Sequence, residues 1–341
     1  MVEPKAVYKK KVRREAMRIS VALISFYAVN IIVTAVITAL FMYFNGLLSV
    51  PYDEAYASLP WGWLSIAGLF SGSFMLLIVR GTRLFTHDLT KTANKINIPD
   101  YLKLIALVLG INAVISVGQM LITMLLQNNG VSTNNAEDVF SLYYMNIPGL
   151  LYVVLLGPIL EEIIFRGAIL RALEPFGKNF AIVVSALLFG LYHLSLFQGI
   201  FAFFIGLVLA YTAMRFSIKW SMLLHILNNA FAMLITYFYV SDGITLGIYL
   251  VFLGLAVLSV VLGFGRLKDQ LRLGKPTPLH FAAKVPVIPS NFVPWDPSFA
   301  GYIANQIAVR ARPFARFFSS AWVIVAISLA TVITLISTFA T

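Results

Sequence analysis

Long apolar runs recur along the whole of this 341-residue chain, and they restrict its fold more than any other feature. A run of about 18 or more apolar residues is typical of a membrane-spanning helix. Only 11% of the residues are charged, against about 25% in an ordinary soluble domain. The short alternating segments of a membrane β-barrel are missing from the sequence. We therefore expect an all-α polytopic protein, multi-pass in the cell membrane.

The apolar runs predict nine transmembrane helices. Their ranges are 19–46, 61–80, 102–127, 149–171, 180–197, 199–215, 220–239, 244–264 and 319–339. With the N-terminus in the cytoplasm, all 25 lysine and arginine residues fall in inner segments, and the outer loops carry only acidic charges. This pattern follows the positive-inside rule and puts the C-terminus outside. The net charge of +11 then favours anionic membrane lipid as a partner and makes nucleic acid an unexpected one.

The same pattern divides the chain into five regions. Residues 1–127 hold three spans with little charge inside the membrane, and residues 147–239 hold four closely spaced spans with every candidate catalytic residue. Residues 240–264 contain the eighth span, residues 265–318 form a cytoplasmic segment, and residues 319–341 carry the last span. Seven prolines in the cytoplasmic segment break regular helix and favour an extended, turn-rich path.

Two adjacent glutamates, Glu161 and Glu162, lie inside the apolar stretch of the fourth span. A carboxylate at the centre of a membrane helix costs about 2.5–3.5 kcal/mol on insertion scales, so two of them indicate a role. Glu162 and Arg166 are four residues apart and can form an ion pair on one helix face. Glu161 is rotated by about 100° from Glu162, which leaves it available as a general base. A purely structural ion pair would account for Glu162 and Arg166 but not for Glu161.

Further polar residues occur on the fifth and seventh spans. His193 follows Phe189 by four residues, and His225 precedes Asn229 by four residues, so each pair shares a helix face. Such side chains can be polar contacts between membrane helices. Beside two buried glutamates, we expect them instead to supply a base and hydrogen-bond donors.

Taken in order, the motifs EExxxR at 161–166, FxxxH at 189–193 and HxxxN at 225–229 resemble those of the CPBP family of intramembrane proteases. This family comprises CAAX prenyl endopeptidases and bacteriocin-processing, or Abi-type, proteins. The resemblance covers residues 147–239, and no motif position is substituted.

The resemblance implies a division of roles among these residues. Glu161 would activate a water molecule together with His193. His225 and Asn229 would stabilise the oxyanion. The supporting residues of the motifs would be Glu162, Arg166 and Phe189. These roles suit peptide hydrolysis, which needs a base, an attacking water and donors where negative charge develops.

The need for a metal stays open at this stage. Glu161, His193 and His225 could form a zinc site with two histidines and one carboxylate. The resembled family has been described both as metalloproteases and as glutamate proteases. The HExxH motif of zinc proteases is absent from the sequence. We favour hydrolysis without a cofactor.

Three functions are consistent with the sequence. The first is an intramembrane endopeptidase acting on a membrane-associated protein or peptide; the resemblance suggests prenylated C-terminal tails, or bacteriocin and signalling peptides. The second is a non-catalytic membrane scaffold or regulator that binds an envelope enzyme or a sensor kinase. The third is a transporter with a carboxylate proton relay, which the lack of inverted repeats and of interrupted helix pairs disfavours.

Overall fold

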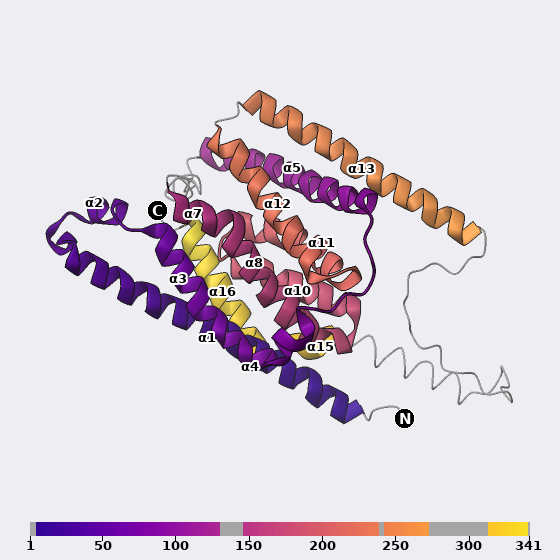
Figure 1. Ribbon diagram of the computed structural model, residues 1–341, viewed down its shortest axis with the longest axis horizontal. Helices are drawn as coiled ribbons and strands as arrows, with labels where there is room; N and C mark the ends of the chain where they lie inside the picture. The colour runs from indigo at the N-terminus through magenta and orange to yellow at the C-terminus, as the bar shows by residue number, and fades with distance from the viewer. Residues whose placement is uncertain (1–4, 130–145, 239–241, 273–312, 340–341) are drawn as a thin grey trace.

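A computed structural model describes residues 5–129, 146–238, 242–272 and 313–339 of the chain (Figure 1). Every regular element in these ranges is a helix, and one isolated bridge joins the backbones of Thr92 and Ser217. The all-helical class expected from the sequence is confirmed. Residues 273–312, which make up most of the proline-rich segment, lie outside the described ranges, as do residues 130–145.

Six helical runs are long and apolar enough to cross a membrane. They are Val7–Phe44, Trp61–Arg80, Ile98–Asn128, Ile147–Phe176, Leu196–Arg215 and Ile218–Ile235. Shorter apolar stretches of 10–17 residues occupy the positions of the other three predicted spans. These stretches are Lys178–Tyr192, Gly243–Leu258 and Ala321–Thr331. The multi-pass character is thus supported by six candidate spans, whereas the total of nine stays a prediction.

The helices form a bundle with two long edges (Figure 1). At one edge, α3 (Trp61–Ser73) and α16 (Ala321–Phe339) pack on α1 (Lys5–Phe44). At the other edge, α5 (Ile98–Asn128) lies along α13 (Asp242–Arg272). The central helices are α8 (Gly157–Glu162), α10 (Lys178–Tyr192), α11 (Leu196–Arg215) and α12 (Ile218–Tyr237). The candidate site residues lie on α8, α10 and α12 or directly after α8 and α10.

The tripeptide Asn-Ile-Pro starts two of these helical runs. The Asn97 side chain accepts a hydrogen bond from the Asp100 backbone at the start of α5, at 2.8 Å. The Asn146 side chain accepts one from the Gly149 backbone at the start of α7 (Ile147–Leu151), at 2.7 Å. Asparagine is a favoured N-cap. Proline is tolerated in the first turn because an N–H at that position would have no acceptor within the helix. The same local signal therefore sets where the third and fourth spans begin.

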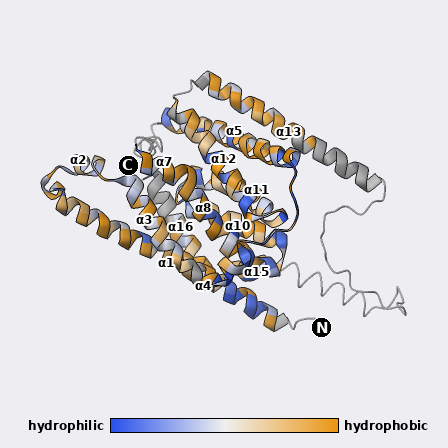
Figure 2. Cartoon of the chain, viewed as in Figure 1, coloured by the Kyte–Doolittle hydropathy of each residue, from blue (hydrophilic) through white to orange (hydrophobic). Residues whose placement is uncertain are grey.

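The connections that carry lysine and arginine meet at one end of the bundle. The Asn94 side chain, between α4 (Leu77–Arg80) and α5, donates to the backbone carbonyl of Arg215 at the end of α11, at 2.7 Å. The Arg316 guanidinium lies 5.1 Å from the ring centroid of Tyr8 near the start of α1. Figure 2 shows hydrophilic residues gathered at this end and apolar residues along the helices.

The fourth apolar run is not the regular helix that was expected over 149–171. It consists of α7, a π-helical stretch at Tyr152–Leu156, α8, a second π-helical stretch at Ile163–Ile169, and α9 (Leu170–Leu173). π-helical turns leave some carbonyls without their usual donors and occur frequently at functional sites. The motif EExxxR spans the junction between α8 and the second π-helical stretch.

α10 and α11 approach each other closely at two glycines. A Cβ atom on Gly190 would lie 2.6 Å from the carbonyl oxygen of Gly199, and one on Gly199 would lie 2.9 Å from the carbonyl oxygen of Gly190. Small residues permit such backbone contact between membrane helices. Because the Gly190 carbonyl also accepts the backbone N–H of His193, this contact helps to place His193.

We expect the substitution Gly190→Ala to lower the stability of the bundle by about 1–3 kcal/mol, as overpacking usually does. The loss should occur even though alanine forms helix better than glycine by about 1 kcal/mol. Thermal unfolding of the purified protein in detergent, followed by circular dichroism, measures it. Gly118→Ala is the matched control, because its Cβ meets no atom within 4 Å. Equal unfolding temperatures for the two variants would contradict the close contact.

Candidate active site

A buried ion pair lies at the centre of the site. The side chains of Glu162 and Arg166 are both fully buried, with Oε1 and an Arg166 terminal nitrogen 3.0 Å apart. The Arg166 guanidinium also lies 4.3 Å from the ring centroid of Phe189 and donates to the backbone carbonyl of Gly206 at 3.2 Å. These contacts connect the fourth span to α10 and α11. The spacing of four residues thus forms the expected pair, although a π-helical stretch begins between its two members.

Glu162 also holds two side chains of α12. Ser221 Oγ donates to Glu162 Oε2 at 2.5 Å, and His225 Nδ1 lies 3.2 Å from Glu162 Oε1. An ionised carboxylate only accepts hydrogen bonds, so His225 carries a proton on Nδ1. The fully buried Glu162 therefore fixes the orientation and the tautomer of His225. A carboxylate commonly does this for a histidine because the hydrogen bond at one ring nitrogen sets the state of the other.

The second glutamate faces the other nitrogen of the same imidazole. Glu161 Oε2 lies 3.7 Å from His225 Nε2, which is longer than a direct hydrogen bond. Its side chain keeps 12% exposure, whereas that of Glu162 has none. The structure thus brings Glu161, Glu162 and His225 together, with the imidazole between the two carboxylates.

His193 lies at the C-cap of α10, and Phe189 separates it from His225. The Phe189 ring is edge-on to both imidazoles, with centroid distances of 4.9 Å to His193 and 5.6 Å to His225. His193 Nδ1 is 2.8 Å from the Phe189 carbonyl oxygen, an acceptor only. Nδ1 therefore donates, and Nε2 of the neutral ring is left as an acceptor. Glu161 lies within electrostatic range of His193.

Asn229 satisfies a carbonyl that the fourth span cannot satisfy itself. Its Nδ2 donates to the backbone oxygen of Val153 at 2.9 Å. In the π-helical turn the N–H of Gly157 bonds to Tyr152 instead of Val153. The next residue, Pro158, has no N–H to offer. The sequence Gly157-Pro158 therefore leaves the Val153 carbonyl without a donor from its own helix. Asn229 on α12 donates the hydrogen bond instead.

A chain of amides holds Asn229 in this orientation. Asn112 on α5 donates to Asn228 Oδ1 at 2.7 Å, and Asn228 donates to Asn229 Oδ1 at 3.2 Å. With its oxygen engaged and one Nδ2 hydrogen on Val153, Asn229 keeps one N–H for another acceptor. Asn112 is buried in a span outside the motifs, so sequence patterns gave no reason to connect it to the site.

Two further side chains near the site did not follow from the motifs. Ser221 lies four residues before His225, so Ser221, His225 and Asn229 share one face of α12, and this spacing could have identified it. Tyr27 of α1 donates through its hydroxyl to the backbone carbonyl of Tyr192, next to His193. No local pattern in the first span indicates that contact.

The described residues contain no group of three or more histidine, aspartate or glutamate side chains placed to hold a metal ion. The zinc set considered from the sequence, Glu161, His193 and His225, does not form such a group in this structure. The Nδ1 atoms of both histidines already have protein partners.

Carboxylates, imidazoles and an amide from neighbouring apolar helices thus come together at this site. Residues 144–231 match a family model described as Rce1-like, type II CAAX prenyl endopeptidase. The searches of curated proteins and of solved structures found no match. The matched segment includes all three motifs, so the resemblance seen in the sequence is confirmed: residues 144–231 are similar to the CPBP, or Abi-type, family. This family implies a CAAX-type protease; the first three spans lie outside the match.

Replacement of Glu162 by glutamine should destabilise the protein by about 3–5 kcal/mol, because Arg166 would keep a buried charge without its partner. Chemical or thermal unfolding in detergent measures the loss. The double variant Glu162→Gln, Arg166→Met removes both charges and should recover much of it. A single variant as stable as the unmodified protein would show that the ion pair does not hold the bundle.

Proposed function

We propose that this protein is an intramembrane endopeptidase that hydrolyses a peptide bond in a membrane-associated protein or peptide. The observation that carries the proposal is the position of His225 between Glu162 at 3.2 Å and Glu161 at 3.7 Å. Both oxygens of Glu162 are already engaged, one in the ion pair with Arg166 and the other in the hydrogen bond from Ser221. In the part of the chain that the structure describes, Glu161 has no comparable hydrogen bond and is available for chemistry.

Glu161 and His193 supply two acceptors for one water molecule. The Glu161 carboxylate can accept a proton, and Nε2 of His193 is the free nitrogen of that ring. A water that donates to both would present a lone pair to the scissile carbonyl carbon. As its oxygen adds to that carbon, the water proton moves to Glu161. This is the division of roles that the resemblance implies.

His225 and Asn229 are the proposed donors to the oxyanion. Donation from His225 Nε2 requires a proton on that nitrogen. Nδ1 also carries a proton, which it donates to Glu162. The donating form is thus the imidazolium, whose charge the two carboxylates on either side offset. The remaining N–H of Asn229 supplies the second donor. Loss of one such donor usually lowers the rate by about 10²–10³.

Collapse of the tetrahedral intermediate completes the reaction. The carbon–nitrogen bond breaks, and the proton held by Glu161 passes to the leaving amine. The products are a new carboxyl terminus and a free amine, with one water consumed. We favour this metal-independent route. Prenylated C-terminal tails are the substrate class that the family description suggests, and bacteriocin or signalling peptides are the alternative.

The substitution Glu161→Gln should abolish peptide hydrolysis while expression, membrane insertion and unfolding temperature stay unchanged, because Glu161 makes no buried ion pair with Arg166. Quantitative peptidomics of cells with the unmodified gene, the variant gene or no gene measures the product and names the substrate. Glu54→Gln, at an exposed position outside the site, is the control and should keep full activity.

The outcomes separate the alternatives. A cellular function that survives Glu161→Gln would instead support the non-catalytic scaffold. Product formation by the purified protein should also persist in a strong chelator; if chelation stops it and zinc restores it, the metal-independent route is wrong while the protease proposal stands.

We also propose that the chain crosses the membrane nine times, with its N-terminus in the cytoplasm and its C-terminus outside. Arg316 lies in α15 (Pro313–Phe318), the short helix directly before α16, and it contacts Tyr8 near the beginning of α1. α1 and α16 then run in the same direction, toward the end of the bundle that lacks the basic connections (Figure 1). The positive-inside rule assigns the basic end to the cytoplasm.

Because the chain has no cysteine, single introduced cysteines can report its topology. Lys9→Cys should react with a membrane-impermeant maleimide only after the cells are permeabilised. Tyr52→Cys, at a residue that is 75% exposed on the opposite side, should react in intact cells. Each variant is the control for the other, and the reverse labelling pattern would contradict the orientation.

A further inference from the structure

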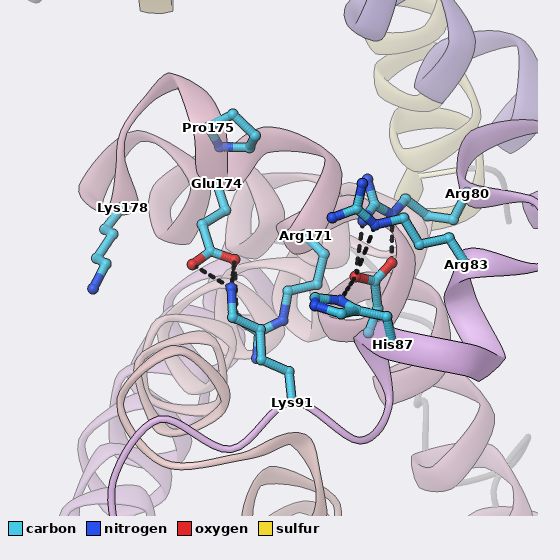
Figure 3. A pocket seen from close by; sticks show the side chains of 9 residues that line it. Arg80, Arg83, His87, Lys91, Arg171, Glu174, Pro175 and Lys178 are labelled. Atoms are coloured by element: carbon cyan, nitrogen blue, oxygen red, sulfur yellow. Dashed lines mark hydrogen bonds and ion pairs between the residues drawn. The ribbon is translucent and has the colours of Figure 1, made fainter.

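A second polar site lies at the basic end of the bundle, apart from the candidate active site. It is a cavity of about 390 Å³ between the connection that follows α4, the end of the fourth span and the first turn of α10 (Figure 3). None of its lining residues belongs to the three motifs. Five of them are cationic: Arg80, Arg83, Lys91, Arg171 and Lys178.

Two carboxylates neutralise part of this charge. Asp88 accepts two hydrogen bonds from Arg80, at 2.6 and 2.8 Å. Glu174 accepts two from Lys91, at 2.9 and 2.8 Å, and one from Arg171 at 3.2 Å. Burial opposes ionisation of Asp88, but the hydrogen bonds from Arg80 and His87 and the nearby positive charge outweigh it and lower the pKa of Asp88. Five cations and two anions leave a formal charge of +3, with His87 neutral.

Arg83, Lys178 and the Nε of Arg171 keep donors that these two carboxylates do not take up. Arg83 reaches Asp88 only at 4.0 Å, and 63% of its side chain is exposed. Lys178 makes no ion pair within the described residues. Arg171 is 3% exposed, and its Nε has no hydrogen-bond partner within the same residues. A buried guanidinium N–H without a partner is costly, so it calls for an acceptor.

The backbone adds to this site. α10 begins at Lys178, and its N-cap residue Gly177 has no side chain to bond the first-turn amides. The first N–H groups of a helix lack intrahelical acceptors, and together with the helix dipole they favour an anion. Lys178 at this position therefore combines a mobile charge with free backbone donors.

We propose that this cavity binds a phosphate group, presented either by the headgroup of an anionic lipid or by a soluble phosphate ester. Arginine forks, a lysine and a helix N-terminus are the groups that bind phosphate oxygens. Basic pockets between membrane helices on the cytoplasmic side commonly take lipid headgroups. The proposal does not depend on the protease activity.

The cavity joins the first region of the chain to the segment that carries the active site. Gly167, next to Arg166, lies so close to the loop after α4 that a Cβ on it would be 2.9 Å from Leu89 and 3.1 Å from Leu84. The same loop supplies Asp88 and Lys91 to the cavity wall. A bound phosphate group would therefore bridge that loop to the end of the fourth span and the start of α10.

Titration of the purified full chain in neutral detergent tests the proposal. The probes are dioctanoyl phosphatidylglycerol, dioctanoyl phosphatidylcholine and inorganic phosphate, and native mass spectrometry and the unfolding temperature measure binding. We expect saturable binding of the anionic lipid over the neutral one, and displacement by phosphate. The double variant Arg83→Gln, Lys178→Gln should raise the dissociation constant about tenfold or more, which is about 1.4 kcal/mol per tenfold.

Two controls make the result specific. Arg14→Gln removes a similarly exposed arginine, 62% exposed and 3.9 Å from Glu15, and should bind as the unmodified protein does. Arg83→Lys with Lys178→Arg keeps the charges and should keep binding, which separates loss of charge from loss of fold.

The outcomes distinguish the source of the phosphate. Binding of phosphate but not of lipid, with the same dependence on Arg83 and Lys178, would support the site and assign it to a soluble ester. No saturable binding of any probe would overturn the proposal. So would equal binding by the double variant, or an equal loss in Arg14→Gln, since either would reflect only the general charge of the surface.

Discussion

The ion pair of Glu162 and Arg166 places two full charges where no water reaches them, and the rest of the site is arranged around that pair. A buried ion pair is tolerated only when further groups satisfy its remaining donors and acceptors. Here Ser221 and His225 from α12 contact the carboxylate, and Gly206 and the Phe189 ring contact the guanidinium, whose Nε has no hydrogen-bond partner among the described residues. The requirement to satisfy the pair therefore also positions the imidazole that the proposed chemistry uses. Only one of the two adjacent glutamates enters this network, and the other is left for the chemistry that we propose.

Irregular backbone in the fourth span has a related consequence. In a membrane, a carbonyl without a donor is expensive, so a π-helical turn followed by proline demands a partner from another helix. The partner of Val153 is Asn229, which is held from behind by Asn228 and Asn112. The side-chain amide of Asn229, a proposed oxyanion donor, is thus held by the Val153 carbonyl that the π-helical stretch of the fourth span leaves without a backbone donor. The Gly-Pro of the fourth span and the asparagines of α5 and α12 form one hydrogen-bonded unit, although they are far apart in the sequence.

The sequence predicted the parts that depend on local spacing. Apolar runs gave the helical class and the positions of the candidate spans, and spacings of four residues gave the pairs Glu162–Arg166 and Phe189–His193. The positions of side chains from different helices depend on tertiary contacts, which the sequence pattern did not predict. His193 and His225 belong to different predicted spans, and only packing sets both beside one phenylalanine ring. The prediction treated the fourth span as one regular helix, because no local pattern shows which carbonyls a π-helical turn releases. Asn112 and Tyr27 act only through helices that are distant in sequence.

Charge at the end of the bundle obeys the same physics as charge in its centre. The positive-inside rule requires cations at one end but does not require them to surround a cavity. In this chain, Asp88 and Glu174 hold Arg80 and Lys91 in place, much as Glu162 holds Arg166, and they do so with fewer negative charges than positive ones. At the centre Glu162 and Arg166 balance each other, and Glu161, which does not pair with Arg166, is left for the proposed chemistry. At the basic end the surplus is positive, and it is left for an anion. In both places, neighbouring side chains are already paired with each other, and a charged group beside them is not. Glu161 is that group at the centre, and Arg83 and Lys178 are those groups at the basic end. These are the positions where we propose that a substrate or a ligand is recognised.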